Sequence, residues 1–189
     1  MTDHHVQNPG DSGRPQGDGD PPPDLTLHMR SNPRLLAGAR EMVASLARRL
    51  GFDEVSACQV ALAVDEALAN VIRHGYERRE DGPIDMLVWL LAPEGNPDAA
   101  PTGLRVVIED EGRQVDPELI KGRDLDDIRP GGLGVHIIRE VMDQVQYEKR
   151  NAGGMRLTLV KRGGAVKDGG SPAGNPPAAA AHGRGSVNG

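Results

Sequence analysis

The chain has 189 residues and a formal net charge of −6, and its single cysteine, Cys58, excludes an internal disulfide and a cysteine-based metal cluster. It has no long run of Lys or Arg and only one Trp, two Tyr and one Phe, so direct nucleic-acid binding is not expected. No basic region followed by an apolar core opens the chain, and no apolar run approaches the roughly 20 residues of a membrane span. We therefore expect a soluble, cytoplasmic protein.

Both ends of the chain are poor in the side chains that build a core. Residues 1–23 contain almost no apolar side chains, and residues 163–189 consist mostly of Gly, Ala, Pro and Ser. Such segments cannot bury enough apolar surface to offset the entropy lost on ordering. We expect two disordered tails and one folded domain over residues 24–162.

The first elements follow the period of the apolar residues. Leu25–Met29 alternates apolar and polar residues, which predicts a strand. Apolar residues then recur at helical spacing over residues 35–50, and Ser31 or Asn32 is expected to cap this first helix.

A second helix is expected from its cap, Asp53, to about Tyr76. Cys58, near the start of this helix, is expected to be a small buried apolar group. The apolar positions that define the buried side of the helix are Val60, Val64, Ala67, Leu68, Val71 and Ile72.

The second half of the chain changes period. Strands are expected over residues 84–91 and 104–108, a third helix over 133–142, and two more strands near 145–150 and 155–161. The order β-α-α-β-β-α-β-β favours an α+β fold, a two-layer sandwich with a mixed, mostly antiparallel sheet and helices on one face.

The first candidate site block is Glu66-Ala-Leu-Ala-Asn70, on the second helix. Glu66 and Asn70 are one turn apart and face the same way, and Arg73 and His74 extend that polar stripe. A carboxylate and a carboxamide oxygen are hard ligands suited to Mg²⁺, and the carboxylate could instead accept a proton from an attacking hydroxyl or water. The simpler interpretation is an exposed polar face.

The second block is Asp110-Glu-Gly112, directly after a predicted strand. An ionised Asp accepts a hydrogen bond from an exocyclic amine, which favours adenine over guanine, and Gly112 lets the backbone turn sharply. An ordinary Asp-x-Gly turn is the alternative.

The third block is Gly131-Gly-Leu-Gly134, before the third helix. Glycines let a backbone approach a ligand closely, and the free N–H groups of a helix start suit phosphate. The alternative is a flexible connection. No Lys-Ser/Thr follows, so this is not a Walker loop, and it also lacks the context of a dinucleotide fingerprint.

Together, these blocks resemble the GHKL ATPases. Asp65–Glu77 is similar to the N-box of that superfamily, Asp110–Pro117 to a reduced G1 box, and Gly131–Glu148 to the G2 box with its following helix and strand. The compact length and the His-Gly-Tyr after the N-box further resemble the RsbW-like anti-sigma factor serine kinases.

This resemblance implies a Bergerat-type sandwich that binds ATP with Mg²⁺. Glu66 would be the catalytic base, Asn70 the Mg²⁺ ligand, and Asp110 the acid that contacts adenine. The other implied nucleotide-binding positions are Arg73 and His74 at the phosphates, Gly112 at the adenine, and Gly131, Gly132, Leu133 and Gly134 beside the phosphates.

The implied function is that of a protein serine kinase and anti-sigma factor. Such a protein sequesters a sigma factor, phosphorylates a STAS-type anti-anti-sigma partner and forms a homodimer, through the sheet side. The alternative is a non-catalytic partner-switching module in which ATP is at most a structural ligand. Two departures motivate the alternative: Gln114 replaces the second glycine of the G1 box, and Gly153-Gly154 replaces a Gly-Thr pair, for which Thr158 is a candidate substitute.

Overall fold

The computed structural model describes residues 21–120 and 133–163 of the chain. The elements in these residues are β1 (Leu25–Arg30), η1 (Pro33–Leu35), α1 (Leu36–Arg49), α2 (Glu54–Asn70), η2 (Val71–Gly75), β2 (Pro83–Leu91), β3 (Gly103–Asp110), η3 (Pro117–Leu119), α3 (Leu133–Val141), β4 (Gln144–Lys149) and β5 (Met155–Lys161). The predicted tails over 1–23 and 163–189 fall almost wholly outside the described residues.

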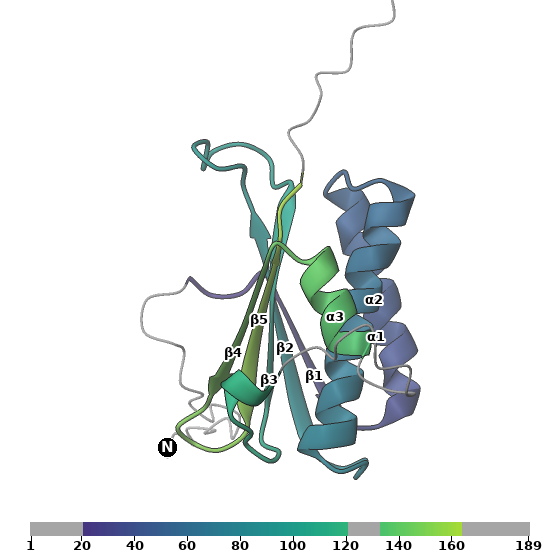
Figure 1. Cartoon of the computed structure of the whole chain (residues 1–189). Helices are drawn as coiled ribbons and strands as arrows, with labels where there is room; N and C mark the ends of the chain where they lie inside the picture. The colour runs from purple at the N-terminus through teal and green to yellow at the C-terminus, as the bar shows by residue number, and fades with distance from the viewer. Residues whose placement is uncertain (1–20, 121–132, 164–189) are drawn as a thin grey trace, which may run out of the picture.

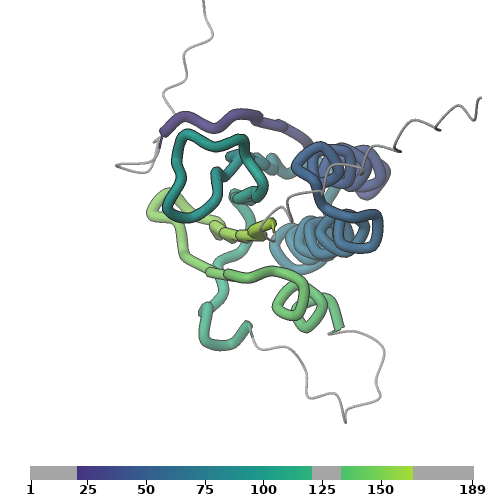
Figure 2. Tube along the Cα trace, turned by 90° about the horizontal axis from the view of Figure 1, so that it is seen from above, coloured from purple at the N-terminus to yellow at the C-terminus, as the bar shows by residue number. Residues whose placement is uncertain are grey.

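The strands form one five-stranded sheet in the order β1-β2-β3-β5-β4. Each of the four neighbouring pairs is antiparallel. The three α-helices cover one face of this sheet, as the side and top views show (Figures 1 and 2). The expected α+β sandwich with helices on one face is therefore confirmed, but the sheet of the described residues is wholly antiparallel and not mixed as expected.

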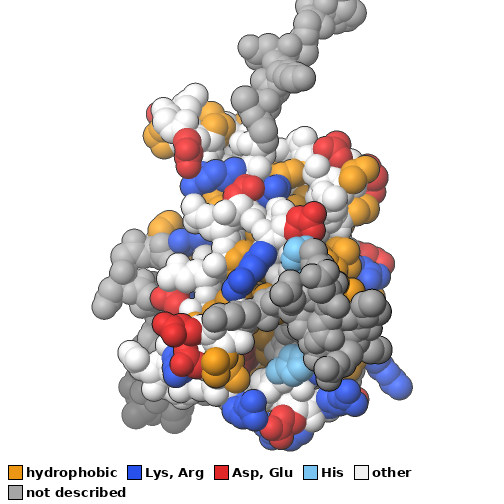
Figure 3. All heavy atoms as spheres, in the orientation of Figure 1, with side chains coloured by type: hydrophobic (Ala, Val, Ile, Leu, Met, Phe, Trp, Pro, Cys, Tyr) orange, Lys and Arg blue, Asp and Glu red, His pale blue; other side chains and the backbone are white. Residues whose placement is uncertain are grey.

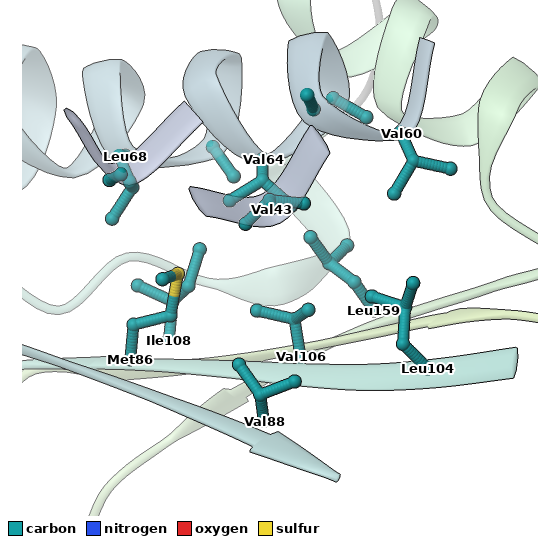
Figure 4. Close-up of a cluster of buried hydrophobic side chains, with 14 of the residues drawn as sticks. Val43, Val60, Val64, Leu68, Met86, Val88, Leu104, Val106, Ile108 and Leu159 are labelled. Atoms are coloured by element: carbon teal, nitrogen blue, oxygen red, sulfur yellow. The ribbon is translucent and has the colours of Figure 1, made fainter. Parts of the chain in front are cut away.

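The core lies between the two layers. Val43, Val60, Val64 and Leu68 from the helices point toward Met86, Val88, Leu104, Val106, Ile108 and Leu159 from the sheet (Figure 4). Successive strand side chains point to opposite faces. Asp110, two residues after Ile108, is therefore on the helix side of the sheet, at the very end of β3.

The central helix, α2 with η2, is long and largely apolar. Contrary to the expectation that no apolar run approaches the length of a membrane span, residues Glu54–Gly75 are long and apolar enough to cross a bilayer by length and composition. The side chains of Val60, Val64 and Leu68 are nevertheless fully buried, and the helix packs against α1 and α3. Its composition is thus that of a core helix covered on several sides.

The predictions that Asn32 and Asp53 cap helices are confirmed. The Asn32 side chain accepts a hydrogen bond from Arg34 N, and Asp53 Oδ1 accepts one from Ser56 N at 2.9 Å. Ser31, the alternative cap, is instead fully buried. Its hydroxyl donates a hydrogen bond to the carbonyl oxygen of Arg79 and accepts one from Gly82 N.

The expectation that Cys58 is buried is wrong. Cys58 is exposed, and its Sγ lies 3.5 Å from Glu54 Oε1 on the preceding turn. Its neighbour Ala57 takes the buried position, because a helix turns by about 100° per residue.

The second helix does not continue as an α-helix to Tyr76. Residues Val71–Gly75 form one π-helical turn, and Glu77 and Arg78 then adopt positive φ angles of 51° and 67°. Single π turns are frequent at functional sites. Arg73 and His74 lie within this one.

Candidate functional site

The start of α3 lies directly against the polar side of α2. A β-carbon built on Gly134 would be 2.5 Å from Glu66 Oε2 and 3.5 Å from Asn70 Nδ2. Figure 1 shows the same arrangement, with α3 beside α2. Three of the predicted residues, Glu66, Asn70 and Gly134, are therefore brought together by the packing of these two helices.

The π turn that follows Asn70 contains Arg73 and His74. Arg73 Nη1 donates a hydrogen bond to Asn70 Oδ1 at 3.3 Å, so the carboxamide oxygen already faces a cation. Burial, followed by the positive charges of Arg73, Arg113 and Arg78, holds the pKa of His74 below its usual value. The neutral imidazole is thus favoured within a ring of arginines.

Arginines gather at this end of the molecule. Lys and Arg side chains surround its lower end in Figure 3, where η2 ends. Arg113, in the loop after β3, is 3.8 Å from Glu77 and lies close enough to His74 to lower its pKa. Arg79 also faces an acid, Asp81, at 4.0 Å, so carboxylates offset part of the positive charge at this end.

Asp110 is the buried acid of the site. Its side chain is 3% exposed, and Oδ1 accepts hydrogen bonds from Gly112 N at 2.8 Å and Met155 N at 3.4 Å. Burial raises the pKa of Asp110, because the low-dielectric surroundings disfavour the charged carboxylate. The charge of Arg150, whose guanidinium bonds to the Asp110 carbonyl oxygen, offsets part of this cost. Buried acids with shifted pKa values concentrate at functional sites.

The loop after β3 is joined to the end of η2. Arg113 N donates to Gly75 O at 2.9 Å, and a β-carbon on Gly75 would be 3.6 Å from Asp110 Oδ1. A β-carbon on Gly112 would be 2.6 Å from the carbonyl carbon and oxygen of Gly75. Gly112 therefore allows a close backbone contact that a larger residue at this position would prevent, whereas a β-carbon on Gly75 would make only an ordinary contact.

The predicted site therefore has two ends joined by η2. Glu66, Asn70 and Gly134 lie at the start of this turn, and Asp110 and Gly112 pack on its last residue, Gly75. Leu133 opens α3 and is 61% exposed. Gly131 and Gly132 lie outside the described residues.

Comparison with known families matches residues 29–161 of the chain to the histidine kinase-like ATPase domain. This match covers well over half of the chain and includes both ends of the site. The chain belongs to the histidine kinase-like ATPase family. Relatives of this chain include proteins named serine-protein kinase RsbW.

Two of those relatives illustrate the similarity. The RsbW of Listeria innocua is 26% identical over 122 residues, which cover 65% of this chain and 77% of the relative. The RsbW of Halalkalibacterium halodurans is 23% identical over 148 residues, covering 74% and 83% of the two chains. Among solved structures, the blue-light activated histidine kinase of Erythrobacter litoralis EL346 has a TM-score of 0.35 at 20% identity, over 64% of this chain and 39% of that chain.

Membership of this ATPase family implies the use of ATP, and the described residues include groups suited to such a ligand. Asp110 is a buried hydrogen-bond acceptor, and Glu66 and Asn70 carry oxygens of the type that Mg²⁺ binds. Within the described residues there is no group of three or more His, Cys, Asp or Glu that could hold a metal by itself. In general, protein-bound Mg²⁺ takes few protein ligands and completes its shell with phosphate oxygens and waters.

Sequence reasoning missed a role for Tyr76. Its hydroxyl donates to Pro83 O at 2.5 Å and accepts from Glu111 N at 2.8 Å, and the side chain is 2% exposed. Tyr76 thus ties the residue after Asp110 to the start of β2. The only available signal was an aromatic residue directly after a polar stripe, which does not predict a buried hydroxyl.

Proposed function

We propose that this ATPase is an anti-sigma factor and serine kinase, which transfers the γ-phosphoryl group of ATP to a serine of a STAS-type anti-anti-sigma protein. The observation that carries the proposal is the contact of Gly134 with Glu66 and Asn70. It supports a phosphate-binding helix start beside a carboxylate, in a chain similar to proteins named serine-protein kinase. The same protein would sequester a sigma factor in the cytoplasm and act as a homodimer.

The two ends of the site would bind different parts of ATP. Asp110 would accept a hydrogen bond from the exocyclic amine of adenine, with Gly112 giving the base room. The phosphates would lie toward α3, whose first N–H groups have no partner within the helix, between Arg73 and Leu133–Gly134. The remaining residues predicted to contact the phosphates are His74, Gly131 and Gly132.

Glu66 would act on the incoming serine. The serine Oγ forms a bond to the γ-phosphorus while the bond between that phosphorus and the β–γ bridging oxygen breaks, and ADP leaves. The serine proton passes to the Glu66 carboxylate. Asn70 would hold Mg²⁺, which neutralises charge on the phosphates when bound.

The test uses the full chain, ATP labelled at the γ-phosphate and a purified STAS-type partner. Wild type should label a serine of the partner, and Glu66→Gln should reduce the rate by about 100-fold or more, since a general base contributes on that scale. Asp65→Asn is the matched control, because Asp65 is the adjacent carboxylate and points toward Arg40 on α1 at 3.9 Å. This control should keep the wild-type rate.

The alternative function predicts a different pattern. A non-catalytic partner-switching module would form complexes with the partner or with a sigma factor, without labelling any serine and without a difference for Glu66→Gln. Co-purification of the sigma factor with and without ATP, together with the labelling assay, separates the kinase from the non-catalytic module. Equal labelling by wild type and Glu66→Gln would contradict the role of Glu66 as base.

A further inference from the structure

Two departures from the family pattern, Gln114 and Gly154, lie next to each other in the structure. Gln114 Nε2 donates hydrogen bonds to Arg150 O at 2.6 Å and to Gly154 O at 3.1 Å. Residues 150 and 154 are the two ends of the turn between β4 and β5, where Arg150 N also donates to Gly154 O at 3.1 Å. The Gln114 amide therefore links the loop after Asp110 to both ends of this turn.

Gly154 itself packs on Asp110. Its φ is +76°, and a β-carbon on it would collide with the carbonyl oxygen of Asp110. Threonine, which is β-branched, fits neither this φ nor this contact. The glycine in place of the family threonine is thus required by the path of this turn.

The turn also contacts Asp110 in two other ways. Arg150 Nη1 donates to Asp110 O at 2.7 Å, and Met155 N donates to Asp110 Oδ1 at 3.4 Å. A shift of the turn would therefore move the backbone of Asp110 and one donor to its carboxylate. Thr158 offers no such contact, because it alternates with Leu157 and Leu159 of the core and so faces away from the helices.

We infer that Gln114 is a positioning residue for the purine end of the site. It holds the β4–β5 turn against Asp110, and Gly154 allows the close contact that results. The two departures act as a pair, replacing the glycine and threonine of the family pattern by a side-chain clamp. This inference rests on the proposed function, since the group being positioned is the acid assigned to adenine.

The test compares Gln114→Ala and Gln114→Glu with wild type in the full chain. Gln114→Ala removes one donor and should weaken ATP binding by about threefold to tenfold, the scale of one or two neutral hydrogen bonds. Gln114→Glu should weaken it further at pH 7.5, because its carboxylate would face the two carbonyl oxygens. Gln146→Ala, an exposed glutamine on β4, is the matched control and should bind ATP as wild type does.

Three readouts separate a positioning role of Gln114 from a general loss of the fold. As the pH is lowered, Gln114→Glu should recover ATP affinity relative to wild type at the same pH, because protonation restores a donor. In the protein without nucleotide, the amides of Arg150 and Gly153 should exchange hydrogen faster in Gln114→Ala, while amides in the middle of β3 keep their rates. At saturating ATP, the phosphorylation rate should stay near that of wild type.

The outcomes distinguish the two proposals. Gln114→Ala with wild-type affinity for ATP would overturn the positioning role alone. Wild type without measurable affinity for ATP would overturn the proposed function and this inference together. The positioning role of Gln114 would be supported by weaker ATP binding of Gln114→Ala with faster exchange confined to the β4–β5 turn. Recovery of ATP affinity by Gln114→Glu at low pH would support it as well.

Discussion

Gly134 on α3 stands so close to Glu66 on α2 that a β-carbon at residue 134 would lie 2.5 Å from Glu66 Oε2. The atom that it would meet is the far end of a flexible side chain. A larger residue at position 134 would therefore displace the carboxylate while the backbone of both helices stays in place. This relationship allows the chemistry of the site to be tested apart from its stability.

Gly134→Ala should leave the free energy of unfolding within about 1 kcal/mol of wild type, since alanine is the better helix former and offsets the local crowding. The rate of phosphoryl transfer should fall by about tenfold or more, because small displacements of a reacting group are costly. Urea unfolding and the labelling assay measure the two effects. Gly38→Ala in α1, where a β-carbon meets nothing within 4 Å, should keep the full rate.

Gly112→Ala should instead destabilise the fold. The β-carbon would lie 2.6 Å from the carbonyl carbon and oxygen of Gly75, which are backbone atoms and cannot swing away. We expect a loss of about 1–3 kcal/mol in the free energy of unfolding, as for other overpacked sites, together with weaker ATP binding. Urea unfolding checks the first effect. A variant as stable as wild type would show that the close contact of these two loops is not required.

Tyr76→Phe should destabilise the protein by about 1–3 kcal/mol, because it leaves Pro83 O and Glu111 N without their buried partner. Tyr147→Phe is the matched control. The Tyr147 hydroxyl makes no hydrogen bond to the described residues, so its removal should change the free energy of unfolding by less than about 0.5 kcal/mol. Equal losses in the two variants would contradict the role given to the Tyr76 hydroxyl.

Much of the architecture was predictable from local patterns. The strand over Leu25–Met29 and the helix starting at Asp53 were predicted because alternation and capping are short-range signals. The strand over Met155–Lys161 was predicted to the residue. The order of strands in the sheet was not predicted, because the pairing of β3 with β5 joins distant segments.

The site was predicted less completely, for a physical reason. Residue types and spacing pointed to Glu66, Asn70 and Asp110, but the π turn that separates Arg73 and His74 from an ideal helical stripe has no recognisable sequence signal. The burial of Asp110 and its contact with the β4–β5 turn depend on tertiary packing. Spacing alone could not show that Gln114 and Gly154 are neighbours.

The His74 ring should report on a bound anion. Burial and the charges of Arg73, Arg113 and Arg78 lower its pKa, so the folded state disfavours the imidazolium and loses stability as the pH falls through the unfolded value, about 6.5. Phosphate charge nearby would reverse part of this effect. An NMR titration of the ring should therefore show a higher pKa with a non-hydrolysable ATP analogue than without it, and no change would place the phosphates elsewhere.

Asp110→Asn should make the protein more stable and the site weaker. The asparagine Oδ1 can still accept from Gly112 N and Met155 N, while the buried charge is removed. Since burial raises the pKa of Asp110 in the folded state, the folded protein binds more protons than the unfolded chain between the two pKa values, and stability falls as the pH rises through that window. Below the pKa of the unfolded state, about 3.9, Asp110 is protonated in both states, so burial of its charge costs no stability. Above the pKa of the folded state it is ionised in both states, and the full cost of burying the charge applies.

The free energy of unfolding of Asp110→Asn, measured in urea, should thus exceed that of wild type at pH 7, and the difference should shrink as the pH is lowered toward about 4. ATP binding should weaken by about tenfold or more, because an amide cannot replace the charged acceptor for an exocyclic amine. A gain in stability with a loss of binding is expected only where a fold keeps a costly buried acid for its ligand. If the variant were less stable than wild type at every pH, the bonds that Asp110 makes within the protein would outweigh the cost of its burial, and the acid would be structural.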